Sequence, residues 1–418
     1  MFKITSLNSL SVLVKIGVGV VSSKVMAVFV GPSGLALVGN FRNFITSIET
    51  VSTLGLQNGV VKYVVDAKDD APALQKVLAT VFISLAVMVV LLSAGLLLFA
   101  HFWSDWLFGP ASDYQAVILA LALALPWYAA SILLVSVLNG LGQFKQVIRV
   151  NLWGNLIGLL TSLLLVWQYK TYGALLSLVL PPALLFVVVV YYLHTKIQFA
   201  QLLTWRLFDK KILRQLASFS LMALVATVLG PLVYVQIRNL VITQLGTVQA
   251  GYWEAMTRIS SYYFMFVATL LSVYFLPKLS QAKTNKATQH VFFAYYKLVL
   301  PLFVLGLFIL YLGRNFWVPL LFSKAFVPVT DLFFWQMVGD VFKAASLILG
   351  YQFFAKKMTV AFIFCELASL GAFYICTLIC MPRYQLQGVV MAQAMASAGY
   401  FFLLVGVFCN QLLAQENK

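Results

Sequence analysis

The stretch that decides the fold runs from Val77 to His101 and reads VLATVFISLAVMVVLLSAGLLLFAH. It contains no Asp, Glu, Lys or Arg, and about 20 apolar residues are enough for a helix to cross the hydrocarbon core of a bilayer. A helix on the surface of a soluble protein carries a polar face, whereas this segment has none. The segment therefore predicts a membrane-spanning helix.

The composition of the whole chain points the same way. Its 418 residues are 62% hydrophobic and only 10% charged, whereas soluble domains are about 25% charged. This excludes a soluble enzyme, a disordered regulator and a secreted disulfide scaffold. The formal net charge is +16, and basic charge on so apolar a chain indicates a membrane and its lipids rather than nucleic acid as the partner.

Apolar segments separated by polar or basic breaks predict twelve membrane spans. Their approximate limits are 9–30, 36–63, 77–101, 114–138, 148–168, 173–194, 216–241, 251–276, 291–312, 331–354, 360–380 and 386–411. We therefore expect an all-α polytopic membrane protein. Several of these spans carry charges, and a strict hydropathy window would therefore underrate them as membrane segments.

The longest connection divides the twelve spans into six and six. We expect an N-terminal lobe over residues 1–195, a basic cytoplasmic linker over 196–215 and a C-terminal lobe over 216–418. Within the linker, residues 202–213 either form an amphipathic helix at the membrane surface or remain a solvated basic loop.

Lysine and arginine asymmetry predicts the orientation. With both termini in the cytoplasm, 18 of the 28 basic residues fall in cytoplasmic segments, and only Lys170, Arg314, Lys324 and Arg383 fall on the opposite side. We therefore expect a multi-pass protein of the cytoplasmic membrane with both termini inside.

The two halves of the chain echo each other weakly. Basic residues and a glycine recur around the first external turn of each half, as Lys24, Gly34 and Arg42 and then as Arg238, Gly251 and Arg258. Two six-helix halves of equal topology predict parallel repeats, arranged as two lobes around a central cavity.

Apart from the residues already counted with the cytoplasmic segments, ten ionisable residues are assigned to the membrane interior, where each charge costs at least a few kcal/mol and so marks a cavity or a partner. The basic residues are Lys15, Lys24, Arg42, Arg238, Arg258 and Lys343. The acidic residues are Glu49, Glu254, Asp340 and Glu366.

Helical spacing predicts two neutralising pairs. Glu254 and Arg258 are four residues apart, and Asp340 and Lys343 are three apart. Structural roles stay open for several of the charges. In these structural alternatives, the Lys15 side chain would extend to the cytoplasmic interface, and Arg238 would be an anchor at the outer interface. Glu254 and Arg258 would form a structural pair between the lobes. Glu366 would cap polar contacts near the cytoplasmic end of its span.

Convergent basic residues would make the cavity cationic, and arginine grips phosphate well. The candidates for binding a substrate diphosphate are Lys24, Arg42, Arg238, Arg258 and Lys343. Glu49 and Asp340 are candidates for coupling to an ion or for charge pairing. Side chains suited to sugar rings, unless they serve packing or an interface belt, are Asn40, Trp253, Tyr262 and Tyr263.

The sequence holds no catalytic constellation: a Walker A loop and an HExxH motif are both missing from it. We therefore expect a protein that is not an enzyme and needs no cofactor, with any uphill work driven by an ion or substrate gradient. The four cysteines, Cys365, Cys376, Cys380 and Cys409, fall in apolar segments without a CxxC, which predicts neither a metal site nor a structural disulfide.

Several motifs together resemble a known family. They are LVKIG at 13–17 with Lys24, GPSGL at 31–35, GNFR at 39–42, SVYFLPKLS at 272–280 and WQMVGDVFK at 335–343. With them the chain resembles, over essentially its whole length, the Wzx-type flippases of O-antigen and enterobacterial common antigen. These belong to the multidrug/oligosaccharidyl-lipid/polysaccharide exporter superfamily.

The resemblance implies alternating access between two six-helix lobes in the bacterial inner membrane. It implies transfer of an undecaprenyl-diphosphate-linked oligosaccharide, such as lipid III or an O-antigen unit, to the periplasmic leaflet. A proton or sodium ion, a glycan polymerase and chain-length proteins would be further partners. The residues that match family charge positions are Lys24, Arg42, Arg238, Asp340 and Lys343, whereas Glu254 and Arg258 are less regular there.

Two other classes of function stay open on the residues alone. One is an ion-coupled exporter of a small anionic or drug-like solute. The other is a membrane scaffold for glycan assembly enzymes, which would tolerate substitution of its cavity charges.

Overall fold

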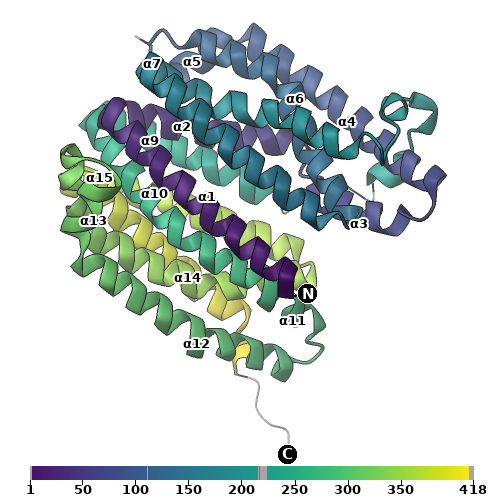
Figure 1. Ribbon diagram of the computed structural model, residues 1–418. Coiled ribbons are helices and arrows are strands. Elements are labelled where there is room, and N and C mark those ends of the chain that lie inside the picture. Colours follow the sequence, from purple (N-terminus) through teal and green to yellow (C-terminus); the bar gives the residue numbers. More distant parts are fainter. Residues whose placement is uncertain (1, 111, 215, 217–223, 414–418) are drawn as a thin grey trace, which may run out of the picture. The chain divides into compact units, whose positions relative to one another are not determined.

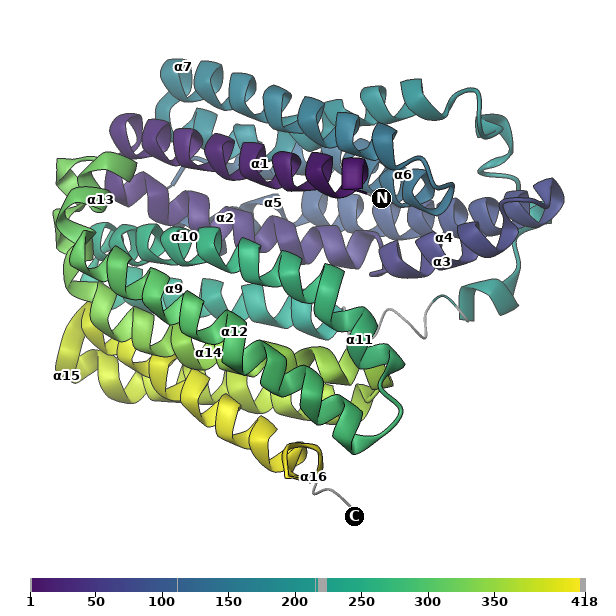
Figure 2. The ribbon, with the colours of Figure 1, turned by 60° about the horizontal axis from the view of Figure 1, so that its bottom comes forward.

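The computed structural model describes residues 2–110, 112–214, 216 and 224–413, and within these residues every regular element is helical. Contacts divide the chain into two compact units, Met1–Val235 and Gln236–Lys418. Each unit is an antiparallel bundle of long helices (Figures 1 and 2).

The first unit contains the helices before the polar connection and the start of the following helix. They are α1 Phe2–Phe29, α2 Gly31–Ser52, α3 Gln57–Ala67, α4 Ala71–Leu98, α5 Ala100–Phe108, α6 Gln115–Gly140 and α7 Phe144–Leu193. Local sequence sets these boundaries. At α4, for example, the Asp70 side chain accepts a hydrogen bond from the Ala73 amide at 3.1 Å, and Pro72 follows in the first turn.

The polar connection forms short turns of 3₁₀ helix, η1 Phe199–Gln201 and η2 Trp205–Leu207, instead of one amphipathic helix over 202–213. The π-helical segment η3 Val225–Leu229 then leads into α9 Gly230–Leu245, and the boundary between the two units falls within α9.

The second unit continues with α10 Thr247–Leu270, the π-helical segment η4 Leu271–Phe275, α11 Leu276–Gln281 and α12 Asn285–Leu312. Short elements α13 Arg314–Leu321 and η5 Lys324–Leu332 precede α14 Phe333–Lys356. The unit closes with α15 Thr359–Val407 and α16 Cys409–Leu412.

Twelve membrane crossings can be followed in the described part of the chain. Eight helical stretches are long and apolar enough to cross a membrane, but α7 and α15 are each two helices joined at a residue with non-helical geometry. Helix α1 and the α2–α3 pair, which the sequence also predicts as spans, complete the set. The all-α polytopic architecture is therefore confirmed.

The two long helices α7 and α15 share the same local backbone geometry at the point where the chain reverses direction. Lys170 in α7 has φ 49° and ψ −122°, and Gln385 in α15 has φ 52° and ψ −134°. Each is followed three residues later by a glycine packed against backbone. A Cβ on Gly173 would lie 1.8 Å from the Leu165 carbonyl oxygen, and one on Gly388 would lie 2.4 Å from that of Cys380. The same geometry thus recurs between the last two helices of each half.

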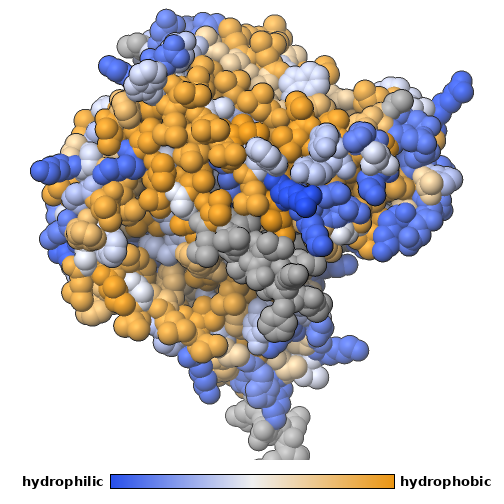
Figure 3. Space-filling model, viewed as in Figure 1, coloured by the Kyte–Doolittle hydropathy of each residue, from blue (hydrophilic) through white to orange (hydrophobic). Residues whose placement is uncertain are grey.

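Large apolar side chains point outward over much of each unit, as Figure 3 shows for one face. On α12 the exposed fractions of Leu298, Leu302 and Leu312 are 65%, 62% and 64%. Such an inverted surface would aggregate in water but is the ordinary outer face of a helix in lipid.

Candidate functional site

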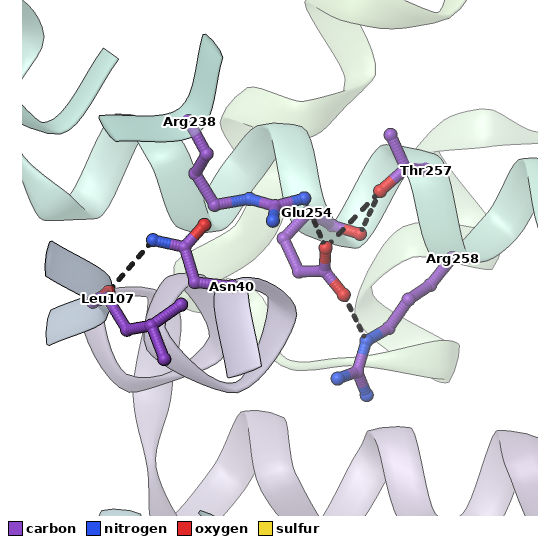
Figure 4. Close-up of polar contacts among 6 residues, drawn as sticks. All are labelled: Asn40, Leu107, Arg238, Glu254, Thr257 and Arg258. Carbon is purple, nitrogen blue, oxygen red and sulfur yellow. Dashed lines mark hydrogen bonds and ion pairs between the residues drawn. The ribbon is translucent and has the colours of Figure 1, made fainter. Parts of the chain in front are cut away.

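A buried cluster of three charges joins α9 to α10 in the second unit (Figure 4). Glu254 accepts a hydrogen bond from Arg238 Nη2 on its Oε2 at 2.7 Å and from Arg258 Nε on its Oε1 at 2.8 Å. All three side chains are at most 5% exposed. The predicted Glu254–Arg258 pair is therefore confirmed, and it lies within one helix rather than between lobes.

The surroundings of the triad hold it in place. The guanidinium carbon of Arg238 lies 5.1 Å from the centroid of the Trp253 ring, a cation–π contact. Thr257 donates from Oγ1 to the Glu254 carbonyl oxygen at 2.9 Å and approaches its Oε2 at 3.5 Å. The formal charges of the three ionic side chains sum to +1, so the cluster stays cationic after internal pairing.

A second buried cluster surrounds Asp340 on α14. Its carboxylate is fully buried and accepts hydrogen bonds from Ser260 Oγ at 2.6 Å, Gln336 Nε2 at 3.1 Å and the Tyr263 hydroxyl. Ser260 and Tyr263 lie three residues apart on α10, so they share a face of that helix. Asp340 therefore ties α14 to α10 through donors on both helices.

Lys343 lies one turn further along α14 and interacts electrostatically with two carboxylates, those of Asp340 and of Glu366 on α15. Glu366 also interacts with Tyr400 in the second half of α15. The Lys343 side chain is exposed, and its Nζ lies 4.9 Å from the centroid of the Phe264 ring. This lysine is thus exposed, and among the described residues it forms no ion pair shorter than 4 Å with either acid, so the close Asp340–Lys343 pair predicted from their spacing is not formed.

In the first unit, Glu49 of α2 is half-buried and accepts a hydrogen bond from the Tyr128 hydroxyl of α6 at 2.8 Å. Lys15 of α1 interacts with it electrostatically. A carboxylate near the middle of the α2–α3 span is thereby linked to two other helices of the same unit.

The structure places the remaining basic candidates of the first unit at partly exposed positions. Lys24 lies in α1 and Arg42 in α2, and both side chains are half-buried. Asn40 is fully buried, and its Nδ2 donates to the Leu107 carbonyl oxygen of α5 at 3.0 Å (Figure 4). Asn40 therefore serves packing between α2 and α5 in this conformation.

The aromatic candidates of α10 differ in their surroundings. Trp253 is fully buried, with its ring centroid 6.4 Å from that of Phe373 in α15. Tyr263 directs its hydroxyl to Asp340, whereas Tyr262 is half-buried. Tyr262 and Tyr263 are thus equally half-buried, and of the two it is Tyr263 that is hydrogen bonded to Asp340.

Sequence reasoning missed four polar partners of the acids. Gln336 could have been found, because it lies one helical turn from Asp340 on the same helix. Tyr128, Ser260 and Tyr400 contact acids on other helices or on the far half of a reversed helix. Such contacts depend on packing that local spacing does not reveal.

Metal-binding chemistry finds no support in the described residues. Among them, no group of three or more His, Cys, Asp or Glu side chains is placed to hold a metal ion. The thiols of Cys365, Cys376, Cys380 and Cys409 are all free.

Comparison with known proteins identifies the family. Residues 25–331 match the family described as polysaccharide biosynthesis protein. Proteins named lipid III flippase from Escherichia coli (strain K12) and from Shigella flexneri are each 32% identical over 404 residues, which cover 95% of both chains.

Solved structures share the fold at low sequence identity. The inward-facing conformation of a multidrug resistance MATE family transporter of the MOP superfamily gives a TM-score of 0.73 at 15% identity, covering 97% of this chain and 94% of the other. The lipid II flippase MurJ in its inward closed conformation gives 0.72 at 13% identity, covering 99% and 90%. The predicted two-lobe architecture of twelve helices is thus confirmed, and the chain belongs to the polysaccharide biosynthesis protein family.

Proposed function

We propose that this protein is a flippase, and not an enzyme, that moves an undecaprenyl-diphosphate-linked oligosaccharide of the lipid III or O-antigen kind across the membrane. The observation that carries the proposal is the 32% identity to lipid III flippases along 95% of both chains. Transfer runs from the cytoplasmic to the periplasmic leaflet of the bacterial inner membrane by alternating access.

The proposed binding residues are the basic side chains within the spans. In the first unit, Lys24 and Arg42 are half-buried and so retain access to a ligand. In the second unit, Lys343 is exposed, and the Arg238–Glu254–Arg258 triad contributes an excess positive charge from within the bundle. Diphosphate is attracted to such groups, because ionic hydrogen bonds are strong where water is excluded.

The orientation belongs to the same proposal. The proposed lobes cover residues 1–195 and 216–418, and a cytoplasmic linker covers 196–215. Because each lobe crosses the membrane six times, both termini lie on the same side as the linker, in the cytoplasm. The distribution of lysine and arginine supports this orientation, since 18 of the 28 basic residues then fall in cytoplasmic segments. A glycan polymerase and chain-length proteins are its proposed partners outside the membrane-spanning bundle.

The direct test of the proposal is charge reversal at Arg42. Arg42→Glu, expressed at the wild-type level, should slow flipping of a diphosphate-prenyl oligosaccharide in proteoliposomes by at least about tenfold, because the new carboxylate repels the diphosphate. The flipping rate of Arg42→Lys should lie between those of the wild type and Arg42→Glu, because lysine keeps the positive charge but cannot bind phosphate in a bidentate way.

Exposed Arg149 at the start of α7 supplies the matched control, because Arg149→Glu makes the same charge change outside the proposed site. Unchanged flipping by Arg42→Glu would contradict the cationic site and favour the scaffold class of function. Transport of a soluble anion or drug by wild-type protein, without lipid flipping, would instead favour the exporter.

Coupling to a proton or sodium gradient is proposed to act through Glu49 and Asp340. Glu49→Gln keeps the size of the side chain and its hydrogen bond to Tyr128, but removes the charge that a cation would bind. Flipping by this variant should no longer accelerate when a proton or sodium gradient is imposed across proteoliposomes. Wild-type flipping that is insensitive to both gradients would eliminate Glu49 and Asp340 as ion carriers.

A further inference from the structure

A long apolar groove lies between α10 and α12 within the second unit. Its volume is about 600 Å³, and twelve residues line it. Apolar residues such as Phe266 and Leu270 of α10 and Leu298 and Leu302 of α12 form its walls. Tyr263 contributes the single polar side chain of the lining, and its hydroxyl is turned to Asp340.

The groove is open along its length. Leu298 and Leu302 are 65% and 62% exposed on its rim, whereas Val267 and Leu307 are 5% and 4% exposed beneath it. Its lining runs from Leu298 to Leu310 along α12, which corresponds to roughly 18 Å of helix. Both α10 and α12 pack against α14, and Figure 2 shows α12 running beside α14.

A cationic group stands beside the aromatic part of this groove. The Phe303 ring of α12 lies 5.6 Å from the ring of Tyr263 and 5.5 Å from that of Phe264, measured between centroids. The exposed ammonium group of Lys343 lies 4.9 Å from the centre of the Phe264 ring. The Phe264 ring thus stands between the hydrocarbon surface and the exposed ammonium group of Lys343, whose electrostatic neighbours also include Asp340 and Glu366.

We propose that the α10–α12 groove holds the first part of the prenyl chain of a polyprenyl diphosphate, with the diphosphate at Lys343. The inference rests on the proposed function and names the surface that recognises the lipid part of the substrate. A neutral hydrocarbon would gain nothing from Lys343, whereas a chain ending in two phosphates matches both the groove and the charge.

The length of the groove limits what it can hold. Roughly 18 Å accommodates a short stretch of hydrocarbon and not a whole undecaprenyl chain, so the rest of the tail stays in the lipid. A soluble prenyl diphosphate with a short chain, such as farnesyl diphosphate, is therefore long enough to fill the groove and serves as the probe.

Gly306 offers a position from which a side chain can be built into the groove. It belongs to the lining, and a Cβ added there would meet nothing within 4 Å. Gly306→Trp should therefore place an indole in the groove. Gly371 of α15 has equally open space around it but lies outside the lining, so Gly371→Trp is the matched control.

The experiment measures binding of three probes to purified protein in detergent: farnesyl diphosphate, inorganic diphosphate and phosphatidylglycerol. Gly306→Trp should weaken binding of farnesyl diphosphate by about tenfold or more, because it displaces the buried hydrocarbon. Binding of inorganic diphosphate should stay unchanged, and Gly371→Trp should behave as wild type. Lys343→Gln should weaken binding of both diphosphates.

Unchanged affinity of Gly306→Trp for farnesyl diphosphate would overturn the proposal. An equal loss for phosphatidylglycerol would also overturn it, because the groove would then hold any membrane lipid. Gly306→Ala and the melting temperatures of all variants show whether a loss comes from misfolding. Wild-type protein that flips no lipid-linked oligosaccharide would contradict the proposed function, whereas normal flipping by Gly306→Trp would contradict the groove alone.

Discussion

Replacing Glu254 with glutamine should be among the most destabilising single substitutions in the second unit. The variant keeps the shape of the side chain but leaves Arg238 and Arg258, 1% and 5% exposed, without the carboxylate that bridges them. Removing one partner of a buried ionic cluster typically costs about 3–5 kcal/mol, because an uncompensated charge stays in a medium of low polarity. Thermal unfolding of the purified protein in detergent measures the loss.

The loss of stability in variants of the triad should follow the sum of the formal charges of its side chains. Glu254→Gln raises its sum from +1 to +2, whereas Arg258→Leu lowers it to zero and keeps the Arg238–Glu254 pair. Adding Arg258→Leu to Glu254→Gln should therefore recover part of the lost melting temperature. A melting temperature of Glu254→Gln equal to that of the wild type would contradict this account of the triad.

Alanine at Gly173 should prevent formation of the reversal in α7. Its Cβ would lie 1.8 Å from the Leu165 carbonyl oxygen and 2.3 Å from the Leu165 carbonyl carbon. Atoms of the backbone cannot rotate away as a side chain can, so the two halves of α7 would have to separate. We expect a loss above the roughly 1–3 kcal/mol of ordinary overpacking, seen as a failure to purify a monodisperse protein.

The same substitution at Gly388 should have a similar effect, because its Cβ would lie 2.4 Å from the Cys380 carbonyl oxygen. Lys170→Gly and Gln385→Gly provide the controls. Both residues occupy positive φ, where a side chain costs about 1–3 kcal/mol and glycine does not. These controls should melt at or above the wild-type temperature. Normal folding of Gly173→Ala would show that the reversal relaxes without cost.

Much of the fold could be predicted from the sequence because membrane spans depend on composition over about 20 residues. The segment from Val77 to His101 predicted α4. Within the described residues the twelve predicted spans are largely helical, with a break in the second span between α2 and α3. The reversals at Lys170 and Gln385 could not be predicted in this way. The geometry of these reversals depends on backbone packing that apolar periodicity does not encode. Once the structure is known, Gly173 and Gly388 can be recognised as the residues that allow this packing.

The candidate site could be predicted only where its contacts lie along one helix. The spacing of Glu254 and Arg258 predicted their ion pair, which is present. For Arg238, the sequence left an anchor at the outer interface open beside diphosphate binding. The structure places Arg238 in the buried triad, because α9 folds back beside α10. Asn40 and Trp253 read as ligand-binding types, and both are fully buried in packing contacts.

The paired reversals also bear on how such a chain could have arisen. Six crossings return a polypeptide to the side of the membrane from which it started. A gene for six helices can therefore be duplicated and fused end to end, and its second copy will insert in the same direction as the first. The matching Lys170–Gly173 and Gln385–Gly388 corners are what such a tandem duplication would leave behind after the surrounding side chains had diverged.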